Sequence, residues 1–422
     1  MTGVPDKPQS GVFASRTEDY VTRQGPGGSE HARHWGLDPA VTFLNHGSFG
    51  ACPTVMLEKQ TEWRERLERQ PLSFFVRDME KPYDASRETL ASFVGADPED
   101  IVFVPNATTG VSTVLRSLTF EPGDELLTTT HEYNACRNAL DFVAARSGAR
   151  VVAVDLPFPI DSPATAVAAI VERVTPRTKL GLFDHITSLT GMVMPIADIV
   201  RAMNERDIDT MVDGAHAPGM VPLDLGSIQP TYFTGNCHKW LCAPKGAALL
   251  YVRRDRQPDI RPLTISHGAN STRSDRSSFW LEFDWTGTRD VTAYLCVGDC
   301  VRFLAELLPG GWDELMAANR SLALEARRIL CERLGATAPC PDAMIGTLAS
   351  VPLGPGDYHF TTTALAFDPI EEALRDEFGI EVPMLAVPDG PGSILRVSAQ
   401  IYNRIEQYEY LADAILELRA RS

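Results

Sequence analysis

A carboxylate and a lysine follow two successive apolar strands in the middle of the chain. Asp213 closes the run Thr210–Asp213, and Lys239 comes shortly after the run Thr231–Gly235. The lysine amine can form a Schiff base with an aldehyde, and the carboxylate can keep a pyridine nitrogen protonated. The pair therefore suits an enzyme that holds pyridoxal phosphate (PLP) and acts on an amino acid.

Lys239 has a competitor in Lys245 for this role. Lys245 stands between a proline and a glycine, a context typical of a solvated turn. Lys239 is flanked by Cys237, His238 and Trp240, which indicates partial burial. Partial burial lowers the pKa of a lysine, as an imine-forming amine requires. We interpret Cys237 as a free buried thiol rather than a nucleophile.

Asp213 and His216 each have two interpretations. An unpaired carboxylate at the end of an apolar strand costs several kcal/mol, roughly, so Asp213 needs a partner. That partner is a protonated pyridine nitrogen, or else Asp213 is a hydrogen-bonded structural residue. His216 could donate to a ring oxygen of the cofactor, or could be a satisfied core histidine.

A candidate phosphate site follows the strand Ile101–Val104, where Asn106–Gly110 opens a helix. Free N–H groups and the helix dipole favour an anion at such a position. Simple helix capping by Asn or Thr explains the same residues equally well. The glycine and lysine spacing of a P-loop or a dinucleotide fingerprint is absent.

Three further positions are candidates with an ordinary alternative. Tyr133 follows a strand and could stack on a ring, or be a half-buried aromatic. Arg396 interrupts an apolar run and could grip a substrate carboxylate bidentately, or form a structural ion pair. Thr286–Thr288 could reach a phosphate, or be a plain loop.

Composition restricts the class of protein. The chain has 422 residues, 44% of them hydrophobic, and a net charge of −17, which argues against nucleic-acid binding. We find no signal peptide and no apolar run long enough to cross a membrane. The eight cysteines include no C-x-x-C pair, so we expect reduced thiols, no metal site and a cytoplasmic location.

The order of patterns predicts an α/β protein. Residues 1–38 read as a polar tail, 39–290 as a large domain and 291–422 as a small α+β domain. Strands are expected at Ile101–Val104, Glu125–Thr128, Arg150–Val154, Leu180–Phe183, Thr210–Asp213, Tyr232–Thr234 and Ala247–Val252. Helices are expected at Thr109–Leu118, Ala135–Ser147, Ala164–Val174 and Ile196–Glu205. Alternation of strands and helices indicates a mostly parallel sheet covered on both faces.

The small domain is expected to combine long helices with a few strands. Its predicted helices are Val291–Leu308, Trp312–Leu334 and Glu406–Arg419, and its predicted strands are Gly346–Val351, Thr363–Phe367 and Ile394–Val397.

Seven segments together resemble class V of the aminotransferase superfamily, within the fold-type I PLP enzymes, and its isopenicillin N epimerase-like group. They are Phe43–Gly50 (FLNHGSFG), Phe74–Asp78 (FFVRD), Pro105–Gly110 (PNATTG), His131–Asn134 (HEYN), Val212–His216 (VDGAH), Gly235–Trp240 (GNCHKW) and Trp285–Thr288 (WTGT). The resemblance implies a seven-stranded large domain, a smaller domain built from both termini, and a homodimer with a shared active site.

The resemblance also implies roles for individual residues. Lys239 corresponds to the Schiff-base lysine and Asp213 to the pyridinium partner, with Tyr133 as the stacking residue. Ring-oxygen contacts are implied for His216 and Ser188, phosphate contacts for Thr108, Asn236 and His238, and a further cofactor contact for Ala107. Thr288 is implied to reach the partner's cofactor. Substrate contacts are implied for Arg396, Asn45, His46 and Arg77.

The implied chemistry begins with removal of a proton from Cα by Lys239 as general base. Our leading interpretation is β-elimination from a cysteine S-conjugate, a C–S lyase reaction of antibiotic or thiol biosynthesis. Epimerisation of the isopenicillin N type is the alternative, followed by decarboxylating deamination, amino-group transfer or a desulfurase-like activity. Tyr133 stands where cysteine desulfurases carry histidine, which disfavours plain desulfuration. A cofactor-free scaffold on the same fold would leave Lys239 idle.

Overall fold

A seven-stranded sheet forms the centre of the protein. The computed structural model describes residues 23–354, 369–387 and 392–421. Its strand order is β2-β8-β7-β6-β5-β3-β4, and all neighbours are parallel except β8, which is antiparallel to both of its neighbours. The strands are β2 (Ile101–Val104), β3 (Glu125–Thr129), β4 (Arg150–Val154), β5 (Thr178–Asp184), β6 (Asp209–Asp213), β7 (Tyr232–Asn236) and β8 (Ala248–Val252). The mostly parallel seven-stranded sheet predicted from the sequence is thus confirmed.

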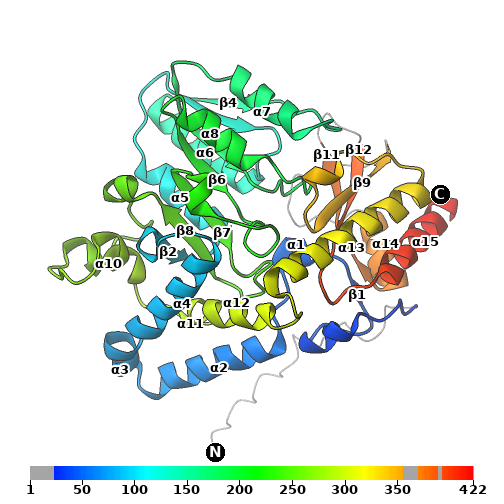
Figure 1. The fold of residues 1–422 in the computed structure, drawn as a ribbon, viewed down its shortest axis with the longest axis horizontal. Coiled ribbons are helices and arrows are strands. Elements are labelled where there is room, and N and C mark those ends of the chain that lie inside the picture. Colours follow the sequence, from blue (N-terminus) through cyan, green and yellow to red (C-terminus); the bar gives the residue numbers. More distant parts are fainter. Residues whose placement is uncertain (1–22, 355–368, 388–391, 422) are drawn as a thin grey trace, which may run out of the picture.

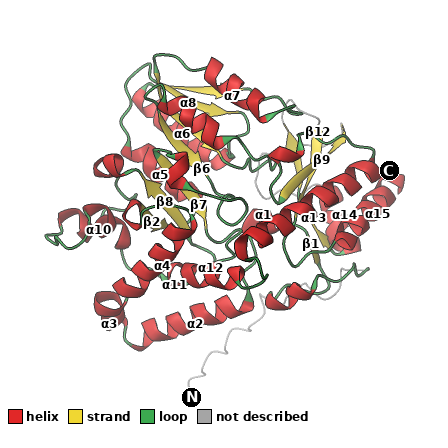
Figure 2. Cartoon of the chain, in the orientation of Figure 1, coloured by secondary structure: helices red, strands yellow, loops and turns green. Residues whose placement is uncertain are grey.

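Helices cover both faces of this sheet, as Figure 2 shows. On one face α5 (Ala107–Ser117), α6 (Asn134–Ser147) and α10 (Ser278–Asp284) pack against alternate strand residues such as Val102, Leu182 and Met211. On the other face lie α4 (Glu80–Phe93), α7 (Pro163–Glu172) and α8 (Ile196–Asn204), over residues such as Phe103, Phe183 and Val212. Burial on both faces explains why the strands are continuous apolar runs.

A second, smaller sheet lies beside the first (Figure 1). It is antiparallel, in the order β11 (Met384–Val387), β12 (Gly392–Ser398), β9 (Leu348–Gly354). The long helix α13 (Gly311–Leu334) packs on it and against α15 (Ile405–Arg421), which also contacts α14 (Pro369–Phe378). This arrangement matches the α+β character predicted for the C-terminal part of the chain.

The N-terminal segment joins the C-terminal part through a short parallel pair. Strand β1 (Thr42–Phe43) pairs with β10 (Ile380–Glu381). Glycine is required just after β1, because Gly50 has φ +71° and an added Cβ would lie 2.2 Å from the His238 carbonyl oxygen. This close approach brings the N-terminal segment against the backbone that carries Lys239.

Some predicted elements differ from the structure. The single helix expected over Val291–Leu308 is divided into α11 (Thr292–Leu295) and α12 (Val297–Ala305), with Cys296 between them. The strand expected at Thr363–Phe367 lies outside the described residues. The domain boundaries stay a prediction.

The remaining α-helices of the described part of the chain are one long helix, α2, and three short ones. They are α1 (His46–Phe49), α2 (Thr54–Arg69), α3 (Pro71–Ser73) and α9 (Leu225–Ile228), together with the short π-helix Phe74–Asp78. In Figure 1, α2 leads away from the centre of the molecule to α3. Within the described ranges, no helix combines the length and apolar character needed to cross a membrane.

Candidate active site

The carboxyl ends of β6 and β7 bring Asp213 and Lys239 to one edge of the sheet, where open α/β sheets bind ligands. Asp213 is buried, and Lys239 is partly buried. The Lys239 Nζ atom lies 3.0 Å from Nε2 of His216. By contrast, Lys245 is exposed, so the structure favours Lys239 as the reactive amine.

Burial dominates the charge state of Lys239. Burial, and next the nearby guanidinium of Arg396, lower the pKa of the amine to about 8, although Asp213 and Asp184 act in the opposite direction. A buried ammonium is poorly solvated, so the neutral amine becomes accessible near neutral pH. Lys239 is thereby prepared to act as a nucleophile and as a base.

His216 and Trp240 favour the same neutral amine. Trp240 donates its indole N–H to Nδ1 of His216 at 3.3 Å. Burial holds the pKa of His216 well below its usual value, so the ring is neutral. A neutral imidazole that accepts at Nδ1 carries its proton on Nε2. This N–H can donate only to a lysine with a free lone pair, so Trp240 acts on Lys239 through the tautomer of His216.

Asp213 is the acceptor of two hydrogen bonds. Its Oδ2 accepts from the thiol of Cys136 at 3.1 Å, and its Oδ1 accepts from the backbone N–H of Ala215 at 2.9 Å. Burial raises the pKa of Asp213, whereas these bonds and the charge of Lys239 lower it. A carboxylate in this position can pair with a protonated ring nitrogen.

The amino terminus of α5 meets the carboxyl end of β7. Asn106 caps the helix by accepting from the Thr109 N–H at 2.8 Å, and Asn236 Oδ1 accepts from the Ala107 N–H at 2.9 Å. Thr108 lies in the first turn and is half-buried. These residues make the end of an eleven-residue helix that favours an anion such as a phosphate.

His238 comes two residues after Asn236, the residue that contacts the first residue of α5. Its Nδ1 lies 2.9 Å from the carbonyl oxygen of Ala247 and donates to it, which leaves Nε2 for another partner. Burial lowers the pKa of His238 to about 4, so the ring is neutral without an anion beside it. The phosphate contact proposed for His238 stays a prediction.

Arg396 is a buried cation with an incomplete set of partners. It donates to the backbone carbonyl of Ser188 and to Oγ of Ser48 at 3.1 Å, but its Nε has no partner among the residues that the structure describes. Ser48 in turn donates to Oδ1 of Asn45 at 2.6 Å. The structure therefore joins three of the expected contacts (Arg396, Ser188 and Asn45), and the free donor suits a carboxylate.

Tyr133 and His46 differ in exposure: the ring of Tyr133 is accessible, whereas that of His46 is buried. Tyr133 is the N-cap residue of α6 and is 44% exposed, so its ring is accessible for stacking. His46 is fully buried, with Nδ1 at 2.8 Å from the Tyr402 hydroxyl and Nε2 at 3.0 Å from the Lys239 carbonyl oxygen. This geometry makes His46 a support for the Lys239 backbone, and its contact with substrate stays a prediction.

Arg77 and Thr288 do not join this group within one chain. Both are exposed. The segments that carry them lie together, because the rings of Phe75 and Trp285 meet at 5.5 Å between centroids. Their expected roles, like those of the other site residues, stay predictions.

Three neighbours of the site were not found from the sequence: Cys136, Glu132 and Asp184. Cys136 stands on α6 and Glu132 just before it, whereas Asp184 ends β5 as Asp213 ends β6. An acidic residue closing two adjacent strands was a usable signal for Asp184. No sequence signal places Cys136 against Asp213, because that contact depends on how α6 packs on the sheet.

The residues present fit PLP. An amine with a lowered pKa, a buried carboxylate and a helix amino terminus lie at one edge of the sheet. The unpartnered Nε of Arg396 adds a site for the carboxylate of an amino acid. When bound, PLP supplies an electron sink for a carbanion formed at Cα.

Comparison with known proteins decides the family. The sequence model of aminotransferase class V matches residues 52–411. The chain belongs to this family. Class V enzymes depend on PLP, so this class V protein is a PLP-dependent enzyme, as the sequence predicted.

Individual class V relatives span almost the whole chain. Isopenicillin N epimerase of Streptomyces clavuligerus is 34% identical over 391 residues, 90% of this chain and 95% of the relative. L-cysteine desulfhydrase of Arabidopsis thaliana is 30% identical over 419 residues, 92% and 90% of the two chains. A structure of C-DES with glycine covalently linked to its PLP cofactor has a TM-score of 0.76 at 24% identity, covering 91% of this chain and 98% of that one. The last similarity supports the fold alone.

Proposed function

We propose that this class V enzyme is a C–S lyase that acts on a cysteine S-conjugate. The reaction converts the conjugate and water into a thiol, pyruvate and ammonia. The observation that carries the proposal is the pairing of a neutral-amine environment at Lys239 with a free donor on buried Arg396. One group removes the Cα proton, and the other holds the carboxylate on the same carbon.

Each residue of the site has its own role in the proposed reaction. Arg396 orients the substrate through its carboxylate, with Ser48 and Asn45 fixing the guanidinium and its neighbours. Lys239 Nζ accepts the Cα proton, and His216 keeps the amine unprotonated beforehand. Asp213 holds a proton on the ring nitrogen at the opposite side. The thiol leaves from Cβ after the Cα proton has gone.

The relatives support two reactions that share this first step. The L-cysteine desulfhydrase relative favours elimination. The isopenicillin N epimerase relative favours the second candidate, epimerisation at Cα of an amino acid on a peptide-like β-lactam precursor. The pathway we propose for either reaction is antibiotic or thiol biosynthesis, and decarboxylating deamination, amino-group transfer and desulfurase-like chemistry are weaker alternatives.

A product assay in deuterated water separates the two reactions. The purified enzyme is incubated with a cysteine thioether, and pyruvate and Cα deuterium are measured. We expect stoichiometric pyruvate and thiol, and their loss in Lys239→Ala. Deuterium at Cα of recovered substrate with no pyruvate would replace elimination by epimerisation.

We also propose that two copies form a dimer with shared active sites. Five exposed apolar side chains come from one stretch of chain along α2: Phe49, Val55, Leu57, Leu72 and Val76. Exposed apolar clusters mark interfaces, and exposed Arg77 and Thr288 would then reach the partner's site. Sedimentation velocity should show a dimer, and Leu72→Asp with Val76→Asp should shift it to monomer. A monomeric wild-type enzyme with full activity would exclude the shared site.

The location we propose is the cytoplasm. All eight cysteines are unpaired thiols in the structure, as in a reducing compartment. Fractionation of the producing cells, with the enzyme detected by antibody, tests this location.

A further inference from the structure

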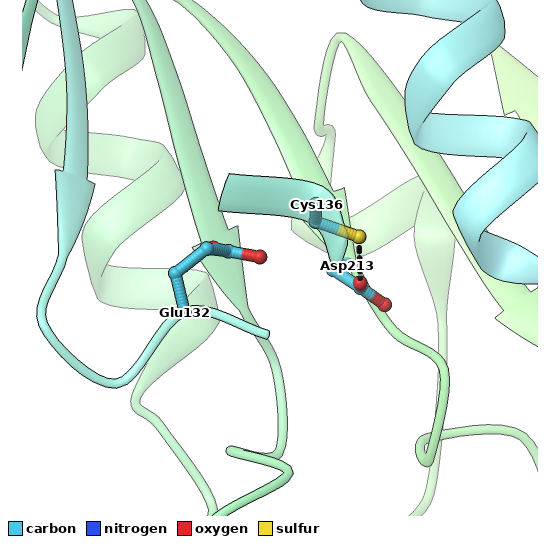
Figure 3. A group of neighbouring side chains, drawn as sticks. All are labelled: Glu132, Cys136 and Asp213. Carbon is cyan, nitrogen blue, oxygen red and sulfur yellow. Dashed lines mark hydrogen bonds between the residues drawn. The ribbon is translucent and has the colours of Figure 1, made fainter. Parts of the chain in front are cut away.

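The buried carboxyl groups of Glu132, Asp184 and Asp213 lie near one another on the face of the large sheet that packs against α6. Polar atoms of Glu132, Cys136 and Asp213 all lie within 4.8 Å of one another. Figure 3 shows the Cys136 thiol directed at Asp213, with the Glu132 carboxyl pointing toward both. Asp184 is the registered neighbour of Asp213 across strands β5 and β6. Of these groups, only Asp213 has a role in the proposed reaction.

Strand alternation places these groups on one face. Leu182 and Met211 face α5 and α6 in the core. Because side chains two residues apart share a face, Asp184 and Asp213 point the same way. The sheet therefore directs two carboxyl groups toward α6, and Glu132 adds a third from the turn before that helix.

The three carboxyl groups are unequally hydrogen-bonded. Asp213 accepts from Cys136 and from the Ala215 N–H. Glu132 Oε2 accepts from the Thr128 hydroxyl at 3.3 Å, and the Tyr133 backbone favours the charged forms of Glu132 and Asp184. Among the described residues, Glu132 Oε1 and Asp184 Oδ2 have no hydrogen-bond partner. Hydrogen bonds to a charged form stabilise it. Asp213 is thus the best supported site for a negative charge.

The charges nearby cannot balance three carboxylates. Burial, together with repulsion between the carboxyl groups, raises the pKa of both Glu132 and Asp184 well above the usual range. The titratable and charged groups facing the cluster are Lys239 from the end of β7, Cys136 and Arg137 from α6, and the Tyr133 phenol. The positive charge of Lys239 lowers the pKa of Asp213 and of Asp184, and the charge of Arg137 lowers the pKa of Glu132.

The same atoms could be considered as ligands for a metal ion. Metal binding requires a thiolate and ionised carboxylates. Burial, and next the negative charge of Asp213, raise the pKa of the Cys136 thiol far above its usual value. With no ion present, the thiol is therefore protonated and donates to Asp213.

We propose that Cys136 is a positioning residue whose thiol selects Asp213 as the one ionised member of three buried carboxyl groups, leaving Glu132 and Asp184 as neutral acids. This inference rests on the proposed contact of Asp213 with the ring nitrogen. Confined to Asp213, the negative charge lies where the cofactor needs it. Without the thiol, the charge is shared with Glu132 and Asp184, and the interaction with the ring weakens.

The first test uses the apoprotein, so it does not depend on the proposed reaction. Infrared difference spectra of wild type against Glu132→Gln and against Asp184→Asn are recorded at about pH 8, where exposed carboxyl groups are ionised. We expect each variant to lack one C=O band of a protonated carboxylic acid. Loss of a carboxylate band instead, in either variant, would overturn the proposal while leaving the C–S lyase proposal intact.

The second test measures PLP affinity by fluorescence titration. We expect Cys136→Ala to raise the dissociation constant about tenfold, the size of a lost hydrogen bond to a charged group. The loss should be larger at about pH 6 than at about pH 9, because the pKa of Asp213 rises without its donor. Cys136→Ser keeps an O–H donor and should restore most of the affinity.

Measuring Cys136→Ala in a double variant that lacks the other two carboxyl groups separates the selection of the charged group from simple packing. With Glu132→Gln and Asp184→Asn both present, no other carboxyl group competes for the charge. Cys136→Ala should then cost less than about threefold in PLP affinity, a non-additive outcome expected of coupled residues. An equal loss in both backgrounds, or no rescue by serine, would reduce Cys136 to a packing residue. Circular dichroism of each apoprotein checks folding, and the infrared result stands if one variant unfolds.

Discussion

The charge state of Lys239 gives a quantitative prediction for the stability of the apoprotein. Burial lowers the pKa of this amine from 10.5 to about 8. One pKa unit corresponds to about 1.4 kcal/mol, so the full shift corresponds to about 3 kcal/mol. Because the side chain is partly exposed, we reduce the expected effect to about 2–3 kcal/mol. Lys239→Met, which keeps much of the volume without the charge, removes this contribution.

The sign follows from proton binding. Between about pH 8 and pH 10.5 the unfolded chain holds a proton on Lys239 that the folded chain has lost. The free energy of unfolding of the wild type therefore rises with pH through this window, relative to Lys239→Met. Below about pH 8 both states are protonated, and the cost of burying the ammonium is fully present.

Thermal unfolding of apoproteins across this pH range measures the effect. Unfolding entropy scales with chain length, at about 2.1 cal/mol/K per residue, so the wild-type Tm should rise by about 2–3 °C relative to Lys239→Met. Lys179→Met, at an exposed position, is the matched control for the loss of one lysine charge. A Tm difference that stays constant, or that falls as the pH rises, would refute the lowered pKa.

Three further substitutions test other contacts of the site. Arg396→Lys should raise KM for an amino-acid substrate about tenfold or more while PLP affinity stays within about twofold, because lysine lacks the bidentate fork; a KM equal to that of wild type would remove the carboxylate role. Trp240→Phe keeps an aromatic ring but removes the donor to His216, so the pKa of the Lys239 base should rise and the acidic limb of the pH–rate profile should move up by about one unit or less; an unmoved profile would contradict the tautomer assigned to His216. Asn106→Ala removes the N-cap of α5 and should cost about 1 kcal/mol in urea unfolding, whereas no loss would mean that the cap is replaced.

Much of the architecture could be predicted because local patterns determine it. Each expected strand of the large sheet corresponds to one observed strand, since runs buried on both faces leave a strong apolar signal. Lys239 and Asp213 could be paired because parallel strands end at one edge. Breaks without a proline or glycine were not predictable, as at Cys296 between α11 and α12.

Contacts that depend on tertiary packing were not predictable. The sequence indicated no link between Cys136 and Asp213, which are far apart along the chain. His46 was expected at the substrate, but its ring lies under the Lys239 backbone beside Tyr402. Such outcomes depend on helix orientation, which apolar periodicity does not determine.

The central claim is that Lys239 is the residue that carries PLP. Borohydride fixes a cofactor bound to a lysine amine, and mass analysis of the digested protein then locates it. We expect the added mass on the peptide that contains Lys239, with visible absorbance lost on reduction and no label in Lys239→Ala. Label on the peptide carrying Lys245 alone, or no label on a protein that retains PLP, would contradict it.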